Sequence, residues 1–504
     1  MIVIAVLLLT LPVAAALAAL VAGARTAQAV TAAAGIATFG LVIALVPAAS
    51  RRDLSFGTFI RIDALSVVFL LATSFLYAAV SVYCIGYLRG GHDGESFSRY
   101  ARRFSLGLNL FAWSMLAAPM MSNLALLWVA IEVTTVISAL LVAIEGTDGS
   151  TEAAWKYILI ASAGLSIALL GTIFMYYAGA QVLGQHYNLA FAPLLQVAHQ
   201  LPHTAVRLAF VLAVLGFGTK VGLFPVHTWL PDAHSEAPTP VSALLSGSLL
   251  AVSFYAILRY YQVAAGTLGP RFPRDVLLVF FVASLLIAAL YLLDQRDYKR
   301  LLAYSSVEHM GILAIGVSFG APVALAGVLL HVLAHAAAKG NAFMGAGVLV
   351  RKFGSKQISS VRGGLDLLPW SGPLFLAAIL ALSAMPPFGI FRSEFEIVAG
   401  GLAASRNVAA VILVVGVTVA FFGLSLATNR MLLSPRATRA AAASRGGPEG
   451  RPTGPAPLTR GEPSAWMVLP VVVGLAALLM LGLHPPGELT GLMARAVTQL
   501  GGPA

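Results

Sequence analysis

Long apolar runs separated by short polar segments make up most of this 504-residue chain. A run of roughly 20 apolar residues is needed to cross the hydrocarbon layer of a bilayer, and about fourteen segments reach that length. The pattern therefore predicts an all-α polytopic membrane protein. The first run resembles a signal peptide, but it lacks a positively charged leading segment and a second run follows directly, so we expect a spanning helix there. The expected helices cover residues 1–23, 27–49, 63–88, 104–122, 124–144, 154–178, 205–226, 238–262, 275–294, 300–320, 322–350, 370–391, 407–430 and 465–484.

Composition narrows the class of protein further. Hydrophobic residues make up 59% of the chain and charged residues 10%, whereas soluble globular proteins contain about 25% charged residues. This excludes a soluble enzyme, a disordered chain and a nucleic-acid binder. Cys84 is the only cysteine, so the chain cannot form an intramolecular disulfide or a cysteine-ligated iron–sulfur cluster. We expect any redox chemistry to take place on other subunits.

The positions of the basic residues predict the orientation. The net charge is +11, but the Lys and Arg residues are spread over the segments between the apolar runs. Loops after odd-numbered helices contain about nineteen of them and loops after even-numbered helices about eight. The odd loops are therefore expected in the cytoplasm and both termini outside, in a bacterial cytoplasmic (inner) membrane. Residues 431–465, rich in Arg, Pro and Gly, are predicted to be a disordered cytoplasmic linker before the last helix.

Several ionisable residues interrupt the apolar runs. A charge at the centre of a spanning helix costs on the order of 2.5–3.5 kcal/mol even on the mildest scale, so such residues usually face a partner or water. The candidate proton-transfer residues are Glu132, Lys220, Glu308, His309, His335, Lys339 and Glu394, with Lys156 and His331 as secondary candidates.

Structural roles remain open for some of these residues. Glu132 and Lys220 could form a structural ion pair, and Lys156 could extend its ammonium group to the membrane interface. A hydrogen bond to a neighbouring helix is as reasonable for His331 and His335 as proton transfer. Glu396 is expected to be a charge at a helix start or at the membrane interface, and not a member of the relay.

The spacing of His331, His335 and Lys339 is i, i+4, i+8, which places them on one helical face over about 12 Å. This spacing suits proton hopping between neighbouring groups. A metal site would need further ligands, and a lysine one turn away is a poor neighbour for a cation, so no metal is predicted.

Two apolar runs share an interruption. In the seventh run Lys220 precedes Pro225, and in the twelfth Pro386 and Pro387 precede Glu394. Paired interrupted segments point to the ion site of a transporter built from repeats, and an offset of five helices places the copies in opposite orientation. The predicted organisation is N-terminal helices in 1–103, a first repeat in 104–264, a second repeat in 275–430, the linker, and a C-terminal helix in 466–504.

The loop after the seventh run contains His227, Asp232 and His234. They could take up protons, or they could cap and solvate the loop. Asp and His are common in wet turns, which favours the second interpretation.

One motif, FGTKVGLFPVHTWLPDAHSEAPTPVSALLSG at 217–247, resembles the proton-conducting antiporter-like subunits of respiratory complex I, multi-subunit cation/proton antiporters and membrane-bound hydrogenases. The segments IDALSVVF, LLAYSSVEHMG, HVLAHAAAKGNAFMGAG and MPPFGIFRSEF extend the resemblance over most of the chain. It implies two inverted five-helix repeats, helices 4–8 and 9–13, each with a half-channel and joined by a central row of charges.

The resemblance also implies roles for particular residues. It matches Glu132 and Lys220 to the family's Glu–Lys pair, Lys339 to the central lysine and Glu394 to the exit-side acid, while Lys156 matches less well. Ser246 stands where complex I relatives often have a histidine, which weakens a relay on helix 8.

The adjacent Glu308 and His309 look like hydrogenase-4 component F. The short segment after the last helix also lacks the length of the lateral helix of the complex I distal subunit.

We therefore expect a proton-translocating membrane subunit of a hydrogenase-4-like or complex I-like redox-driven pump. Its partners would be the other membrane and peripheral subunits, and nickel–iron, iron–sulfur or flavin centres would lie only on those partners, with no cofactor in this chain. One alternative is a subunit that exchanges Na⁺ for H⁺. Another is a membrane component that energises inorganic-carbon uptake through a soluble zinc protein. An inert scaffold fits least well, because so many intramembrane ionisable groups would be costly.

Overall fold

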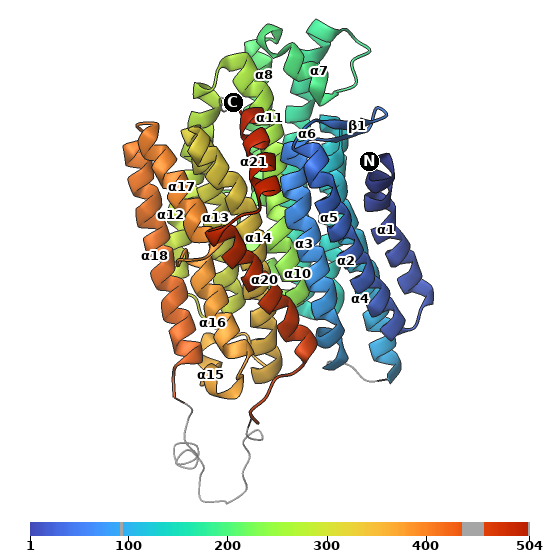
Figure 1. Cartoon of the computed structure of the whole chain (residues 1–504), viewed down its shortest axis with the longest axis vertical. Helices are drawn as coiled ribbons and strands as arrows, with labels where there is room; N and C mark the ends of the chain where they lie inside the picture. Colours follow the sequence, from blue (N-terminus) through green and yellow to red (C-terminus); the bar gives the residue numbers. More distant parts are fainter. Residues whose placement is uncertain (91–93, 436–457, 502–504) are drawn as a thin grey trace, which may run out of the picture.

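The computed structural model describes residues 1–90, 94–435 and 458–501, and most of these residues are helical (Figure 1). Within this part of the chain, twelve helices are long and apolar enough to cross a membrane. Each of the expected spanning segments contains a helix. The prediction of an all-α polytopic membrane protein is confirmed.

The helices form one bundle. Their bounds are α1 Ile2–Val21, α2 Ala24–Ala49, α3 Ala64–Tyr87, α4 Gly94–Ala117, α5 Leu124–Val142, α6 Asp148–Leu183, α7 Phe191–Gln196, α8 His203–Val221, α9 Trp229–Glu236, α10 Thr239–Leu244, α11 Leu250–Leu268, α12 Arg271–Leu292, α13 Tyr298–Phe319, α14 Pro322–Phe353, α15 Gly364–Leu367, α16 Ser371–Leu382, α17 Gly389–Ala403, α18 Asn407–Leu432, α20 Ala465–Leu483 and α21 Gly487–Gln499.

Polar residues at the helix starts explain several boundaries. The side chain of Asp63 accepts the Ser66 N–H at the start of α3, and Asn123 accepts the Leu126 N–H at the start of α5. At the start of α13, Asp297 accepts two backbone N–H groups. Each cap satisfies donors that an isolated helix leaves free, which matters most where lipid offers no partner.

The interrupted spans are present as expected. The seventh expected span ends with α8, and the chain is non-helical from there to the short helix α9. The twelfth expected span is divided into α16 and α17 around Pro386 and Pro387. In Figure 1, α16 lies in the lower half of the bundle and α17 above it. The inverted arrangement of two repeats, and the domain limits drawn from it, remain predictions. The linker prediction for 431–465 falls largely on residues 436–457, outside the described residues.

α14 occupies the centre of the bundle and is buried along most of its 32 residues. It packs against α3, α10, α13, α16, α17 and α20. The continuous segment α10–α11 is buried except near its C-terminal end and contains a π-helical turn at Leu245–Leu249. The side chains that α14 places in the core are therefore shielded from lipid.

Glycine allows α6 and α8 to pack closely. A Cβ added to Gly216 on α8 would lie 2.3 Å from the backbone nitrogen of Ala168 on α6 and 2.6 Å from its Cβ. Only a residue without a side chain permits this approach, as in small-residue contacts between membrane helices. Gly216 is one turn before Lys220, so the contact fixes the position of that lysine.

The chain ends with a helix that the apolar pattern does not predict. α21 is amphipathic and docks on α3, where Gln499 Oε1 accepts the backbone N–H of Leu65 at 3.1 Å. Beside it a buried ion pair joins α3 to α11: Arg259 Nη2 lies 2.7 Å from both carboxylate oxygens of Asp63. A small hairpin of β1 (Leu54–Phe56) and β2 (Ile60–Ile62) covers the same end of the bundle.

Candidate functional site: a row of buried ionisable residues

Lys220 is fully buried near the end of α8, and its ammonium group points at α5. It donates to the Thr134 hydroxyl at 2.7 Å, to the Thr135 hydroxyl at 2.5 Å and to the carbonyl of Ile131 at 3.0 Å. These three oxygens solvate the ammonium group without neutralising its charge. The helix breaks two residues later at Gly222, which adopts φ +97°, so the lysine sits at the edge of the interruption.

Glu132 lies on α5 next to this site but does not form a direct ion pair with Lys220 in the described structure. Its Oε1 instead accepts the Ser162 hydroxyl of α6 at 3.0 Å. The two charges are adjacent and held by different helices. Their distance can therefore change without breaking an ion pair.

Lys156 lies at the surface of the bundle. Its ammonium group is 2.7 Å from Glu152 and 3.4 Å from Asp232, and Asp232 also contacts Arg300. The side chain of Lys156 is 48% exposed. Lys156 therefore occupies the interfacial position that the sequence left open. It does not belong with the buried residues around Lys220 and Lys339.

Lys339 is the second fully buried lysine, near the middle of α14. Its ammonium group donates to the carbonyl of Leu302 at 2.9 Å and to the Ser305 hydroxyl, both on α13. As with Lys220, neutral oxygens of a neighbouring helix receive the charge. The environments of the two lysines are alike in this respect.

Three helices bring His309, His331 and Glu394 together. His309 Nδ1 lies 3.1 Å from His331 Nε2 and 3.9 Å from Glu394 Oε1. His309 is on α13, His331 on α14 and Glu394 in the first turns of α17, directly after the break. Exposed fractions are 1%, 0% and 7%. The structure therefore brings three of the predicted candidates of the second half into one contact cluster.

His335 and Glu308 complete this row. The His335 ring packs against His309 with centroids 5.1 Å apart, and neither of its nitrogens has a hydrogen-bond partner among the described residues. Oε2 of Glu308 is likewise buried and unpartnered within the described chain. Glu396 lies apart, paired with Arg392 at 3.0 Å. Unsatisfied buried polar atoms are rare in folded proteins, and here they adjoin the cluster of His309, His331 and Glu394.

Ser246, which stands where complex I relatives often have a histidine, lies between α10 and α11. Its hydroxyl lies 2.7 Å from that of Ser306 on α13, inside the π-helical turn. Ser306 is next to Ser305, the partner of Lys339. A hydroxyl pair passes hydrogen bonds between helices but does not hold a charge at neutral pH.

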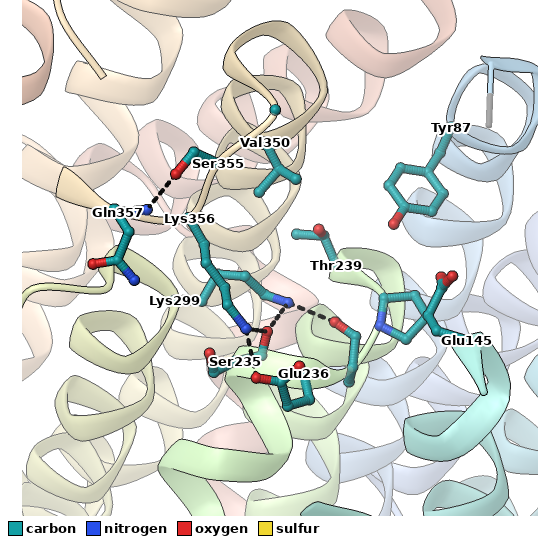
Figure 2. A pocket seen from close by; sticks show the side chains of 13 residues that line it. Tyr87, Glu145, Ser235, Glu236, Thr239, Lys299, Val350, Ser355, Lys356 and Gln357 are labelled. Atoms are coloured by element: carbon teal, nitrogen blue, oxygen red, sulfur yellow. Dashed lines mark hydrogen bonds and ion pairs between the residues drawn. The ribbon is translucent and has the colours of Figure 1, made fainter. Parts of the chain in front are cut away.

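A pocket of about 470 Å³, lined mostly by polar residues, lies at one end of the bundle. The loops that meet there follow α3, α5, α9, α12 and α14, and they are the loops expected in the cytoplasm. The lining of the pocket comes from the ends of α3, α5, α9 and α14 and the start of α13. Figure 2 shows Lys299 and Lys356 converging on Ser235 and Glu236. Lys299 donates to the Ser235 carbonyl at 2.9 Å, and Lys356 pairs with Glu236 at 2.5 Å.

His234 lies directly behind this pocket. It is fully buried, its ring stacks on Phe343 of α14 at 5.1 Å, and both ring nitrogens are unpartnered in the described structure. Burial lowers the pKa of the His234 imidazole well below its ordinary value, and the positive charges of Lys299 and Lys339 lower it further. His234 therefore stands between the pocket and the central row.

The expectation that His227 and His234 cap and solvate a loop is wrong. Their exposed fractions are 4% and 0%, because the segment after α8 folds back as α9 and packs against α6 and α13. Asp232 alone fits the expectation, half-buried in the surface cluster with Lys156 and Arg300.

The sequence analysis did not identify the hydroxyl groups that bind the two buried lysines and His331. The Thr134–Thr135 pair directly follows the Glu132 region, and Ser305–Ser306 precede Glu308, so both pairs are visible as polar residues in apolar runs. Ser393 bonds His331 Nδ1 at 2.9 Å, and only the fold shows that contact.

Comparisons with known proteins fit this arrangement. The family described as "NADH:quinone oxidoreductase/Mrp antiporter, TM" matches residues 121–421. The hydrogenase-4 component F homolog of Methylacidiphilum infernorum (isolate V4) is 35% identical over 372 residues, which cover 73% of this chain and 78% of that protein. NADH-quinone oxidoreductase subunit N of Desulforudis audaxviator (strain MP104C) is 33% identical over 356 residues, with coverage of 70% and 68%. A chain of the Mrp complex from Dietzia sp. DQ12-45-1b shares the fold with a TM-score of 0.80 at 22% identity, over 99% of this chain and 98% of that one.

Proposed function

Because the chain belongs to the NADH:quinone oxidoreductase/Mrp antiporter transmembrane family, we propose that it is the proton-translocating membrane subunit of a hydrogenase-4-like redox-driven pump. The contact of His309, His331 and Glu394 across three helices is the observation that supports this most directly. Burying ionisable groups in this way costs free energy, and such groups commonly mark ion pathways in membrane proteins.

In this proposal Lys220 and Lys339 hold protons in turn. Lys220 releases its proton when Glu132 moves away or is neutralised, because the remaining oxygen ligands solvate the ammonium group but supply no negative charge. The proton reaches the Lys339 and His335 region, and Glu394 hands it to the outer side. Moving one charge against 100 mV costs roughly 2.3 kcal/mol, which sets the electrostatic change that the site must supply.

Proton uptake is assigned to the pocket at Glu236 and Lys299, with His234 behind it. The loops that line this pocket are rich in basic residues, which supports a position on the cytoplasmic side. This orientation puts both termini outside the cytoplasmic (inner) membrane of a bacterium. The redox centres, nickel–iron and iron–sulfur or flavin, are assigned to partner subunits, because a single buried cysteine cannot ligate a cluster in this chain.

Replacing Lys220 by alanine in the intact complex tests the proposal. Donor-driven acidification of inverted membrane vesicles should be abolished, while electron transfer to a soluble acceptor continues. Lys352→Ala is a matched control at the end of α14, away from the buried row. Unchanged acidification in the Lys220 variant would overturn the assignment.

The main alternative is Na⁺/H⁺ exchange without redox chemistry, which the fold shared with the Mrp complex supports. Transport that strictly requires Na⁺ and no electron donor would favour it. Purification of the complex in mild detergent separates these cases, because a hydrogenase-like large subunit supports the pump and small antiporter subunits alone support exchange. A large soluble zinc protein as the retained partner would instead support inorganic-carbon uptake.

A further inference from the structure

We propose that His309, His331 and Glu394 form a binding site for a divalent transition-metal ion, with Zn²⁺ as the best fit. One ligand atom from each of these three buried residues lies within 4.8 Å of the other two. The spacing of His331 and His335 on one helix indicates no metal site, because further ligands are needed. The fold supplies those ligands from α13 and α17.

The distances suit tetrahedral coordination. Zinc–nitrogen and zinc–oxygen bonds of about 2.0–2.1 Å place neighbouring ligand atoms of a tetrahedron about 3.3 Å apart. His309 Nδ1 is 3.1 Å from His331 Nε2 and 3.9 Å from Glu394 Oε1. Small side-chain rotations, well under 1 Å at the ligand atoms, would bring these two separations to the tetrahedral value. The ligand atoms of His331 and Glu394 lie within 4.8 Å of each other, so the Glu394 carboxylate must also approach His331 by up to about 1.5 Å.

Ser393 prepares His331 as a ligand. The Ser393 hydroxyl donates its single hydrogen to the carbonyl of Ile390 at 2.8 Å, so its oxygen must accept from His331 Nδ1, 2.9 Å away. This contact fixes the His331 tautomer and leaves the Nε2 lone pair directed at His309. An imidazole whose second nitrogen is held in this way is the usual arrangement of a metal-ligating histidine.

The positive charge of Lys339 acts on the site through space, but oxygens of α13 hold its ammonium group in place. Its ammonium group is bound to Leu302 and Ser305 of α13, which precede His309 by seven and four residues. These positions are about 10 Å and 6 Å away along the α13 axis. The Glu394 carboxylate, meanwhile, supplies a negative charge directly at the proposed ion.

The ligand set selects the class of metal. Two imidazoles and one carboxylate suit Zn²⁺ and similar borderline ions and match the three-ligand sites that keep one position open. Mg²⁺ and Ca²⁺ prefer oxygen ligands. His335, packed on His309 with both nitrogens unpartnered in the described chain, is available for the fourth position.

Cobalt titration of the purified full chain in detergent tests the site, because tetrahedral Co²⁺ absorbs visibly and Zn²⁺ should displace it. We expect one Co²⁺ per chain, lost in His331→Ala and in the nearly isosteric Glu394→Gln. Ser393→Ala should weaken binding roughly 10- to 100-fold, as for other outer partners of metal-binding histidines. His199→Ala, an exposed histidine before α8, should bind like the wild type.

Absence of stoichiometric binding to the wild type would overturn the inference, as would spectra that are unchanged in both His331→Ala and Glu394→Gln. Elution of each variant as a folded species in size-exclusion chromatography is required for comparison. Glu394→Gln preserves shape, so it guards against a result caused by misfolding.

Transport gives a separate outcome that rests on the proposed function. An ion at His309 and Glu394 would occupy the proposed proton route, so saturating Zn²⁺ should block vesicle acidification in the wild type. Ser393→Ala, in which the ion binds more weakly, should need a roughly 10- to 100-fold higher Zn²⁺ concentration for the same block relative to its own metal-free rate. Binding without inhibition would leave the metal site standing and overturn the assigned route instead.

Discussion

Replacing Gly216 by alanine should displace Lys220 and impair proton transport. The added Cβ would lie 2.3 Å from the backbone nitrogen of Ala168, whereas an unstrained contact is about 3.5 Å, so α8 must move by roughly 1 Å from α6. Overpacking of this kind costs about 1–3 kcal/mol. The Lys220 hydrogen bonds of 2.5–3.0 Å to α5 cannot follow such a shift without weakening.

The expected result is a lower thermal unfolding midpoint together with a loss of donor-driven acidification of up to about 100-fold, because a 1 Å misplacement can have that effect. Both are measurable on the same preparation, by tryptophan fluorescence on heating and by a pH-sensitive dye in vesicles. Gly40→Ala is the matched control, since a Cβ there meets nothing within 4 Å. Wild-type acidification in Gly216→Ala would refute the reasoning that close α6–α8 packing positions Lys220.

Three further variants test other parts of the structure. Asp63→Asn removes one partner of the buried ion pair with Arg259 and should cost about 3–5 kcal/mol, measured as a lower unfolding midpoint in detergent. Burial raises the pKa of Asp63, but Arg259 and the Ser66 N–H outweigh it and lower the pKa below its ordinary value. The stabilising effect of the ionised carboxylate is therefore complete above about pH 4 and is lost as the pH falls through the lower pKa of the folded state. An unfolding midpoint that stays constant over this pH range would contradict the role of the ion pair. Ser246→Ala breaks the hydroxyl contact to α13 and should slow acidification while costing about 1 kcal/mol of stability; unchanged acidification would exclude this contact from the route. Glu236→Gln in the pocket should slow proton uptake, whereas the exposed Asp366→Asn should not, and equal rates in stopped-flow acidification would argue against uptake there.

The spans could be predicted because length and hydropathy are local properties of the chain. The interruptions were predicted from proline and glycine close to an ionisable residue. Proline alone is not sufficient, because Pro12, Pro47 and Pro470 lie inside the continuous helices α1, α2 and α20. α21 escaped notice because half of an amphipathic helix is polar and its run is short. α9 was misread because Asp and His are typical of turns, while packing against α6 and α13 buries its histidine.

The residues of the candidate site could be predicted from the sequence, but the contacts between them could not. A charged residue in an apolar run is conspicuous, so Glu132, Lys220 and Lys339 could be selected from sequence. Which groups meet depends on helix rotation and crossing, which periodicity leaves undetermined. The preference of Lys220 for threonine hydroxyls, and the contact of His309 with Glu394, therefore required the folded structure.

The central helix α14 also fixes the distances between the ionisable residues that it carries. His331, His335 and Lys339 are set about 6 Å apart by the helical rise, and no motion short of unwinding α14 alters those intervals. Adjustable gaps occur only where another helix completes the row, and the most adjustable one belongs to Glu394 in α17, which begins at a break and has no continuous helix below it. The rate of proton transfer along the row would then depend on the gap between Glu394 and the histidines. A conformational switch should therefore be sought in the angle of α17 relative to α14.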